Sequence, residues 1–266
     1  MAAKKIAIIG GGNLGSSIAD GLLESGFIKA KDLSITRRNE KALARYKEQG
    51  AFVSSDNAEA IRRSEVLIIA LKPYNVREIL QSVKKELDPQ KHMLISVVTG
   101  VFMDELAKIV GARMPLFRAM PNTAIAIRQS MTCICEQNAT AAQSKYVSDM
   151  FHQLGVAVNI DEKLMDASTV LGACGIAYAL RYIRANIQGG IEIGFDARTA
   201  NLIAAQTVKG AAELLIRGNT HPEQEIDKVT TPKGCTIAGL NEMEHQGFSS
   251  SLIKGITVSY NKIVKG

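Results

Sequence analysis

Aromatic residues are scarce in this 266-residue chain, which has no tryptophan and an aromatic content of only 5%. That scarcity disfavours binding of single-stranded nucleic acid, because such proteins stack bases on aromatic side chains. The sequence also has no dense run of lysine and arginine, although its net charge is +6. We therefore expect no nucleic-acid partner, and we interpret the positive charge as a solvated surface on which a few cations hold anionic small molecules.

The sequence also lacks the pattern of a metal centre. Its cysteines, Cys133, Cys135, Cys174 and Cys235, form no C-x-x-C pair and have no cluster of histidines beside them. Reduced structural thiols are the ordinary reading of such cysteines in a cytosolic chain. We therefore predict no metal site.

Long apolar runs are missing as well. No segment approaches the roughly 20 apolar residues of a membrane span. The apolar run Ile6–Ile9 after Lys4 and Lys5 is too short for the core of a signal peptide. We expect a soluble, cytoplasmic protein with no membrane partner.

What the chain does have is enough apolar material for a core, at 46% of its residues. Up to about residue 160, short apolar runs alternate with helical periodicity. The strand candidates are Lys5–Ile9, Leu33–Thr36, Val66–Leu71, Met93–Val98, Leu116–Met120 and Met131–Cys135. In the first helix candidate, Leu14, Ile18 and Leu22 lie on one face and Gly26 marks the end. The other candidates are Glu40–Gln49, Tyr74–Leu87 and a short helix that ends with Leu106–Val110. Apolar strands between helices indicate an α/β fold with a parallel sheet covered on both faces, which is a doubly wound, Rossmann-type unit.

Beyond about residue 160 the strand pattern nearly vanishes. Leu164–Gln188, Ala197–Arg217 and Phe248–Val264 are predicted helices rich in alanine, leucine and isoleucine. We predict a dinucleotide-binding domain over residues 1–161 and an all-helical domain over residues 162–266. A helical domain of roughly 100 residues has a limited core, which favours a homodimer or a higher homo-oligomer that buries its apolar faces.

A glycine-rich loop follows the first predicted strand. Gly10, Gly12 and Gly15 form G-x-G-x-x-G, with Asn13 and Leu14 between the last two glycines. The pattern alone is weak, but here it lies between a strand and a helix at the start of an α/β unit. The glycines allow the tight turn, the approach of a pyrophosphate and close helix packing, while the helix start offers free N–H groups. We predict a nicotinamide dinucleotide at this loop; the alternative is a glycine turn without a ligand.

The residues after the second strand bear on the choice of cofactor. Arg37 and Arg38 stand where an NAD-preferring site would place a carboxylate, and the first carboxylate is Glu40. An arginine can clamp the 2′-phosphate of NADPH in bidentate fashion. We favour NADPH, with NADH as a possible second cofactor. The alternative is that both arginines are ordinary surface residues.

Further cofactor contacts are expected at the carboxyl ends of other strands, where ligands of such sheets bind. We assign this role to Asn57, to Leu71, Lys72 and Pro73, and to Asn122 and Thr123. Asn122 and Thr123 offer donors and acceptors to a nicotinamide carboxamide. The alternative for each segment is a plain turn between a strand and a helix.

One stretch of the helical domain could hold an anion. Thr231 before Pro232 is predicted as a helix N-cap with proline at the first helical position. The amides of Gly234, Cys235 and Thr236 then lie near the helix start and can bind a carboxylate. An ordinary capped helix is the alternative.

Together these segments resemble the pyrroline-5-carboxylate reductase family, over nearly the whole chain. The resemblance is carried by Ile9–Leu14, Leu71–Pro73, Arg118–Thr123, Ala204–Ala211 and Lys228–Thr236. It implies a Rossmann domain, a helical dimerisation domain and NAD(P)H-dependent reduction of a cyclic imine to L-proline. It also implies that Thr231, Gly234, Cys235 and Thr236 bind the substrate carboxylate. The Thr236 hydroxyl would then lie near the imine nitrogen, as the catalytic, orienting group.

The chain departs from the family pattern in two places. Ala173–Tyr178 has the sequence Ala-Cys-Gly-Ile-Ala-Tyr where the family usually has Gly-Ser-Gly-Pro-Ala-Tyr. At the helix start, Lys233 replaces the first glycine of the family's Ser-Pro-Gly-Gly run. These changes motivate an alternative, a non-catalytic NADP(H)-binding sensor or partner-binding dimer. A β-hydroxyacid dehydrogenase is disfavoured, because Ala179 stands where that class needs lysine after a Gly-x-x-Gly pair.

Overall fold

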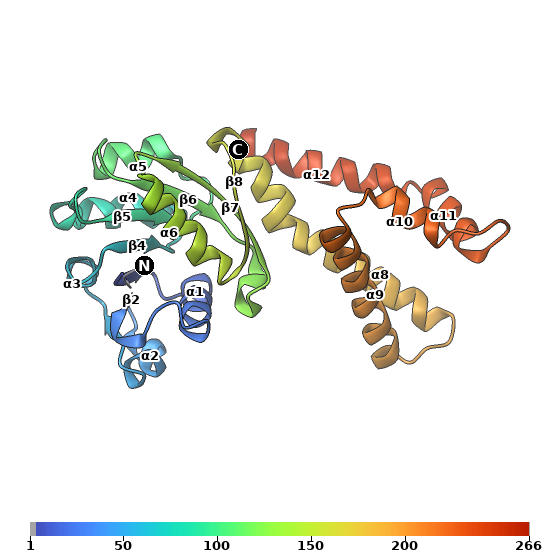
Figure 1. Ribbon diagram of the computed structural model, residues 1–266, viewed down its shortest axis with the longest axis horizontal. Helices are drawn as coiled ribbons and strands as arrows, with labels where there is room; N and C mark the ends of the chain where they lie inside the picture. The colour runs from blue at the N-terminus through green and yellow to red at the C-terminus, as the bar shows by residue number, and fades with distance from the viewer. Residues whose placement is uncertain (1–3, 266) are drawn as a thin grey trace. The chain divides into compact units, whose positions relative to one another are not determined.

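The structure, a computed structural model, describes residues 4–265. The chain divides into two compact units, the first ending at Cys174 and the second beginning at Gly175 (Figure 1). Each unit has its own architecture. The domain boundary predicted between residues 161 and 162 stays a prediction.

The first unit contains an eight-stranded sheet with the order β3-β2-β1-β4-β5-β6-β7-β8. The strands are β1 (Ile6–Ile9), β2 (Leu33–Thr36), β3 (Phe52–Ser54), β4 (Val66–Ile69), β5 (Met93–Ser96), β6 (Leu116–Met120), β7 (Ser130–Gln137) and β8 (Gly155–Asn159). Ile8 of β1 pairs with Ile35 of β2 on one side and with Ile68 of β4 on the other. The strand order reverses at β1, which confirms the doubly wound, Rossmann-type class and places the ligand crevice at the carboxyl ends of β1 and β4.

The expectation of a wholly parallel sheet is wrong at one pair. Strand β7 runs antiparallel to β6, with Ala119 opposite Ile134, whereas the other neighbouring pairs are parallel. Only the short 3₁₀ turn η4 (Thr123–Ile127) joins these two strands. A parallel crossover needs a dozen or more residues, so the chain can only fold back. The strands β3 and β8 escaped prediction because they are edge strands whose side chains are mostly half-buried or exposed.

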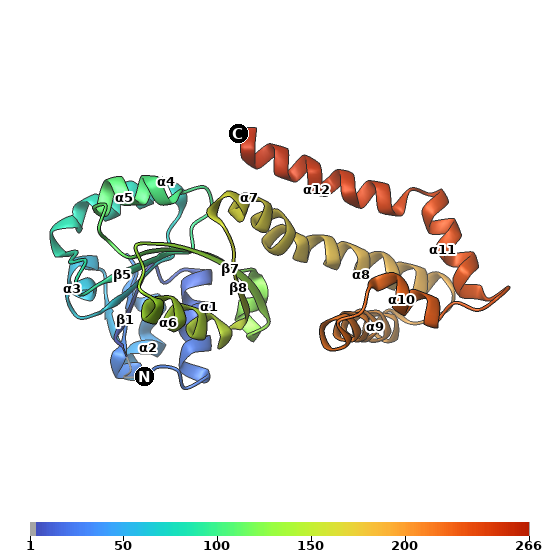
Figure 2. The ribbon, with the colours of Figure 1, turned by 45° about the horizontal axis from the view of Figure 1, so that its top comes forward.

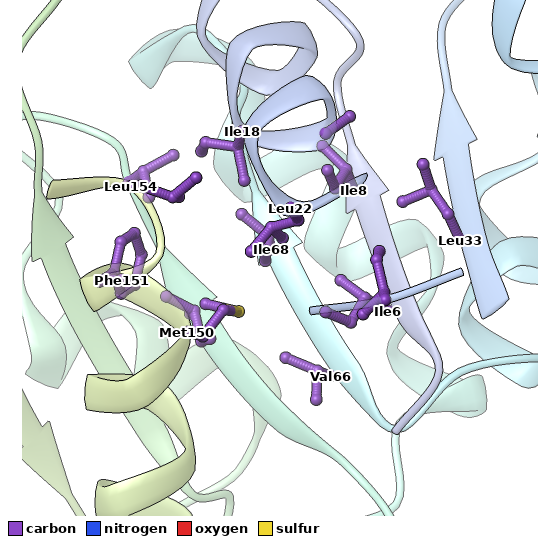
Figure 3. Close-up of a cluster of buried hydrophobic side chains, with 14 of the residues drawn as sticks. Ile6, Ile8, Ile18, Leu22, Leu33, Val66, Ile68, Met150, Phe151 and Leu154 are labelled. Carbon is purple, nitrogen blue, oxygen red and sulfur yellow. The ribbon is translucent and has the colours of Figure 1, made fainter. Parts of the chain in front are cut away.

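Helices cover both faces of the sheet and create two apolar cores. They are α1 (Asn13–Glu24), α2 (Ala44–Glu48), α3 (Asn57–Arg62), α4 (Pro73–Ser82), α5 (Met103–Val110) and α6 (Ala141–His152). Figure 2 shows α4 and α5 on one face and α1 and α6 on the other. Ile18 and Leu22 of α1 pack with Phe151 of α6 against the sheet (Figure 3), while Leu80 and Leu106 belong to the opposite cluster. The helix predicted over Glu40–Gln49 is instead a 3₁₀ turn, η2 (Glu40–Leu43), followed by α2.

The last part of the first unit departs from a regular helix. A 3₁₀ turn, η5 (Glu162–Leu164), leads into α7 (Met165–Ser168) and a π-helical segment, η6 (Thr169–Cys174). The single helix predicted over Leu164–Gln188 therefore begins with three different helical geometries before it continues as α8 (Gly175–Glu192). Met165 is fully buried in the core that α4 and α5 cover. The segment 162–174 is thus packed into the first unit.

In the second unit the described residues form helices joined by short connections and no strand. After α8 come α9 (Ala197–Gly218), α10 (Pro222–Lys228), α11 (Cys235–His245) and α12 (Phe248–Lys265). Of its residues 175–265, only Ala200 and Ala204 are buried, and many large apolar side chains are exposed, among them Leu180, Leu202, Ile216 and Ile253. A monomer that exposes so much apolar surface is unusual. Within residues 4–265, none of the helices combines the length and apolar character that crossing a membrane would require.

Candidate functional site

The glycine loop turns sharply between β1 and α1. Gly10 has a φ of 111°, and a side chain there would overlap the carbonyl oxygen of Ala70 at the end of β4. A side chain at Gly15 would likewise overlap the carbonyl of Gly10. At Gly12 the situation differs, because no described atom lies within 4 Å of the position that a Cβ would take. Two glycines are therefore needed by the fold, and the third leaves open space at the helix start.

That open space lies at a helix start that no side chain caps. Gly12 is the N-cap of α1, and its carbonyl accepts from the amide of Ser16 at 2.8 Å. The amides of Asn13, Leu14 and Gly15 belong to the first helical turn and have no partner within the helix. Among the described residues no side chain caps this end, and the first turn contains no acidic residue. The loop therefore fits the pyrophosphate of a dinucleotide, which free amides and the helix dipole favour.

Beyond β2 the chain places two exposed arginines beside this loop. The Nη1 atom of Arg37 donates to the carbonyl of Gly11 at 3.1 Å, and the amide of Gly11 donates to the carbonyl of Thr36 at 2.7 Å. The Oε1 atom of Glu40 accepts from the amide of Ser55 at 2.7 Å. The positive charges of Arg37 and Arg38 are thus exposed at this end of β2.

Asn57 lies at the first position of α3, beside the end of β2. The hydroxyl of Thr36 donates to its Oδ1 atom at 2.6 Å. This bond brings the predicted cofactor residue Asn57 to the same edge of the sheet as the glycine loop. Its Nδ2 group is still available to a ligand.

The other strand ends lie where the parallel sheet predicts them. Lys72 is the N-cap of α4 and Pro73 its first residue, while the side chain of Leu71 borders Gly10. Asn122 follows β6; its Oδ1 accepts from the amide of Ala124 at 3.0 Å and its Nδ2 donates to the carbonyl of Gly172 at 3.3 Å. Thr123 is exposed beside it. The side chain of Asn122 is thus held in one orientation by the protein itself.

In the second unit the helix start lies further along the chain than predicted. Helix α11 begins at Cys235 with Gly234 as its N-cap, so the assignment of Thr231 as N-cap is wrong. Thr231, Pro232, Lys233 and Gly234 instead form a β-turn closed by the Gly234 amide and the Thr231 carbonyl at 2.9 Å. Proline suits both the second position of such a turn and the first position of a helix, so the sequence alone leaves the two open.

The turn changes which amides are free. The Gly234 amide is used in the turn, so the free amides are those of Cys235, Thr236 and Ile237 in the first turn of α11. A Cβ on Gly234 would lie 2.6 Å from the Oγ1 atom of Thr231, which explains the glycine. The hydroxyl group of Thr236 stands on this first turn, and Cys235 is exposed beside it. Such a helix start can bind a carboxylate.

Sequence reasoning missed one charged group close to the end of β6. Arg118 is 2% exposed, and its Nη1 donates to the Oε1 of Glu162 at 2.8 Å. Across the sheet, burial raises the pKa of the Cys135 thiol to about 11, and the charge of Glu162 adds to the shift while that of Arg118 opposes it. The signal was present in the sequence, because Arg118 interrupts an otherwise apolar strand.

Titratable groups elsewhere give no sign of a metal centre. In the part of the chain that the structure describes, no three histidine, cysteine, aspartate or glutamate side chains gather as ligands would. The candidate groups described above are helix amides, hydroxyls and arginines. Groups of these kinds are suited to binding anions.

Comparison with known proteins identifies both units. Residues 162–265 match the family model for pyrroline-5-carboxylate reductase dimerisation, and residues 5–100 match the model described as NADP oxidoreductase coenzyme F420-dependent. A solved pyrroline carboxylate reductase of Plasmodium falciparum with NADP bound superposes with a TM-score of 0.88 at 26% identity, covering 99% of this chain and 98% of that chain.

Two curated relatives from Dictyostelium discoideum extend the match. The chain is 44% identical to pyrroline-5-carboxylate reductase 1 over 97% of its own length, but spans only 49% of that longer protein. It is 42% identical to pyrroline-5-carboxylate reductase 2 over 98% of its own length and 93% of that protein. The chain belongs to the pyrroline-5-carboxylate reductase family.

Proposed function

We propose that this chain reduces 1-pyrroline-5-carboxylate to L-proline with NADPH, the last step of proline synthesis. The full-length relationship to pyrroline-5-carboxylate reductase 2 carries this proposal. Two helix starts without a side-chain cap support it, at Gly12 in the first unit and at Gly234 in the second, since the reaction needs two anionic molecules to be held.

The first unit supplies the cofactor site. Gly10, Gly12, Asn13, Leu14 and Gly15 would hold the pyrophosphate, and Arg37 and Arg38 would hold the 2′-phosphate. Asn57, Leu71, Lys72, Pro73, Asn122 and Thr123 would border the rest of the molecule. When bound, NADPH supplies a hydride to the imine carbon and becomes NADP⁺. The NADP-bound relative supports NADP as the cofactor, with NADH as a second possibility.

The second unit supplies the carboxylate site. The free amides of Cys235 and Thr236 would bind the substrate carboxylate, and the turn that Thr231 and Gly234 close would hold them in place. Reduction of C=N needs one hydride on carbon and one proton on nitrogen. A protonated imine already holds that proton, so the Thr236 hydroxyl only orients the nitrogen, and no strong general acid is needed.

The dimerisation match and the exposed apolar side chains of the second unit support a homo-oligomer of this chain. A homodimer is the simplest form. The cytoplasmic location and the absence of a nucleic-acid partner remain predictions. The non-catalytic sensor stays the alternative, because Lys233 and the segment Ala173–Ile176 depart from the family pattern.

Turnover and binding assays on the full chain separate these proposals. We expect NADPH oxidation on addition of racemic 1-pyrroline-5-carboxylate, with proline as the product, and a slower reaction with the six-membered cyclic imine. Thr231→Ala should raise the KM for the imine and leave the Kd for NADPH unchanged. NADPH binding without turnover of either imine would contradict the reductase and favour the sensor.

A further inference from the structure

Arg118 is a charged side chain inside an apolar core. It lies on β6 between Leu116 and Met120, and all three side chains face the core that α4 and α5 cover. Only 2% of the Arg118 surface is exposed. A buried arginine of this kind is expensive, because desolvation of the charge must be offset by good partners.

The partners of Arg118 offset that cost only in part. Glu162 accepts from Nη1 of Arg118 at 2.8 Å and also from the amide of Met103, at the start of α5, at 2.7 Å. The guanidinium carbon of Arg118 lies 5.0 Å from the centre of the Phe102 ring. Its Nε and Nη2 atoms are buried and have no hydrogen-bond partner among residues 4–265. An apolar side chain at this position would cost less, so stability alone does not account for the arginine.

A second bond joins the same two parts of the chain. Asn122, four positions beyond Arg118, donates through Nδ2 to the carbonyl of Gly172. The strand β6 and the turn after it therefore hold the segment 162–174 at both ends, through Glu162 and through Gly172. Met165 and Val170, between these ends, are buried. The segment contains the π-helical turn, a geometry that occurs often at functional sites.

We propose that Arg118 is a positioning residue for the reduction. Its ion pair with Glu162 fixes the segment 162–174, and the Gly172 carbonyl of that segment in turn fixes the carboxamide of Asn122. Asn122 is one of the residues assigned to the nicotinamide side of the cofactor site, so the inference rests on the proposed function. Arg118 does not touch the ligands; it sets the place of a group that does.

The test uses the variants Arg118→Met and Glu162→Gln in the full chain. We expect kcat to fall by about tenfold or more, because small displacements of a positioning group cost that much. The Kd for NADPH should change less than kcat, since the glycine loop is intact. Without any ligand, deuterium exchange of peptides that cover residues 162–174 should become faster. Arg118→Lys, which keeps the charge, should recover part of both the rate and the protection.

Two controls separate positioning from a general loss of stability. Leu80→Ala creates a cavity in the same core without touching the ion pair, and should lower the unfolding temperature but preserve kcat per folded enzyme and exchange over 162–174. Arg62→Met removes a partly exposed arginine that pairs with Glu86 at 3.2 Å, and should change none of these quantities.

The proposal is overturned if Arg118→Met and Glu162→Gln behave like Leu80→Ala, with lower unfolding temperature but wild-type kcat and unchanged exchange over 162–174. Should Arg118→Met not fold, Glu162→Gln decides alone, because it keeps the size of the side chain. Failure of the proposed function is seen separately, as a wild-type chain that does not turn over the imine. In that case the deuterium exchange of peptides 162–174, compared between the wild type, Arg118→Met and Glu162→Gln, still decides whether the ion pair fixes the segment.

Discussion

The guanidinium of Arg37 donates to the carbonyl of Gly11, at 3.1 Å, and so joins the end of β2 to the glycine loop. The neighbouring Arg38 is exposed. The two arginines therefore differ: Arg37 is held against the loop by an internal bond, whereas the charge of Arg38 stands in solvent. Both charges lie at the edge of the sheet where the ribose of a dinucleotide would lie.

Removal of these charges should change cofactor preference. We expect the double variant Arg37→Ala, Arg38→Ala to lower the ratio of kcat/KM for NADPH to that for NADH by about tenfold to a hundredfold, as expected for lost charged hydrogen bonds. Arg38→Ala alone should lower kcat/KM for NADPH and leave kcat/KM for NADH unchanged. Arg37→Ala should lower kcat/KM for both cofactors, because it also loosens the glycine loop. Steady-state kinetics with both cofactors measure this. An unchanged ratio in the double variant would mean that the arginines are ordinary surface residues.

Gly12 and Gly15 should respond differently to the same substitution. Gly12→Ala places a methyl group in open space, so its free energy of unfolding should fall by no more than about 1 kcal/mol, the cost of alanine at an N-cap, while its Kd for NADPH rises. Gly15→Ala drives a methyl group into the Gly10 carbonyl and should destabilise the unit markedly. Urea unfolding and NADPH titration by fluorescence measure the two effects. Wild-type NADPH affinity in Gly12→Ala would argue against a pyrophosphate at the loop.

Lys233 adopts a left-handed backbone, with a φ of 60°, at the third position of the turn before α11. Type II turns prefer glycine there, since a side chain in this conformation costs about 1 kcal/mol or more. Lys233→Gly removes this strain but also makes the unfolded chain more flexible, which offsets part of the gain. We therefore expect the free energy of unfolding to rise by about 0.5 kcal/mol. Denaturation at one fixed chain concentration is the measurement, because an oligomer's stability depends on concentration. A less stable variant would show that Lys233 makes a favourable contact that offsets its backbone strain.

His92, the residue before β5, should make the first unit sensitive to acid. Burial lowers the pKa of His92 below its usual value of 6.5, and the charge of Lys91 lowers it further, against the opposing charge of Asp88. Its Nδ1 accepts from the amide of Asp88 at 2.9 Å, which requires the neutral ring. Since the unfolded chain binds the proton more readily, stability should fall as pH drops below about 6.5.

His92→Asn keeps an acceptor for the Asp88 amide but cannot titrate. The fall in unfolding temperature between pH 7 and pH 5.5 should therefore be smaller in this variant than in the wild type. His152, which is exposed on α6, serves as the matched control, and His152→Asn should keep the wild-type pH dependence. Equal pH dependence in His92→Asn and wild type would assign the acid sensitivity to other groups.

Much of the first unit could be predicted because its strands are buried on both faces. The runs Val66–Ile69 and Met93–Ser96 are predicted as buried strands without any knowledge of their neighbours, and Gly10 and Gly15 are required by local backbone geometry. The edge strands β3 and β8 lack that continuous pattern. Strand β7 runs antiparallel to β6 because the connection between them is short. The apolar pattern of a strand carries no information on its direction.

The sequence by itself determined where the candidate groups stand: a glycine loop after the first strand, arginines after the second strand, and threonines on both sides of Pro232. These follow from residue types at fixed spacing, where backbone sterics and hydrogen-bonding groups are local. Only the tertiary structure decided that the α11 cap is Gly234 rather than Thr231, and that Arg118 meets Glu162, which lies 44 residues away along the chain. A proline can serve two turn geometries, and a buried charge finds its partner only when distant segments pack, so neither outcome is encoded in a local pattern.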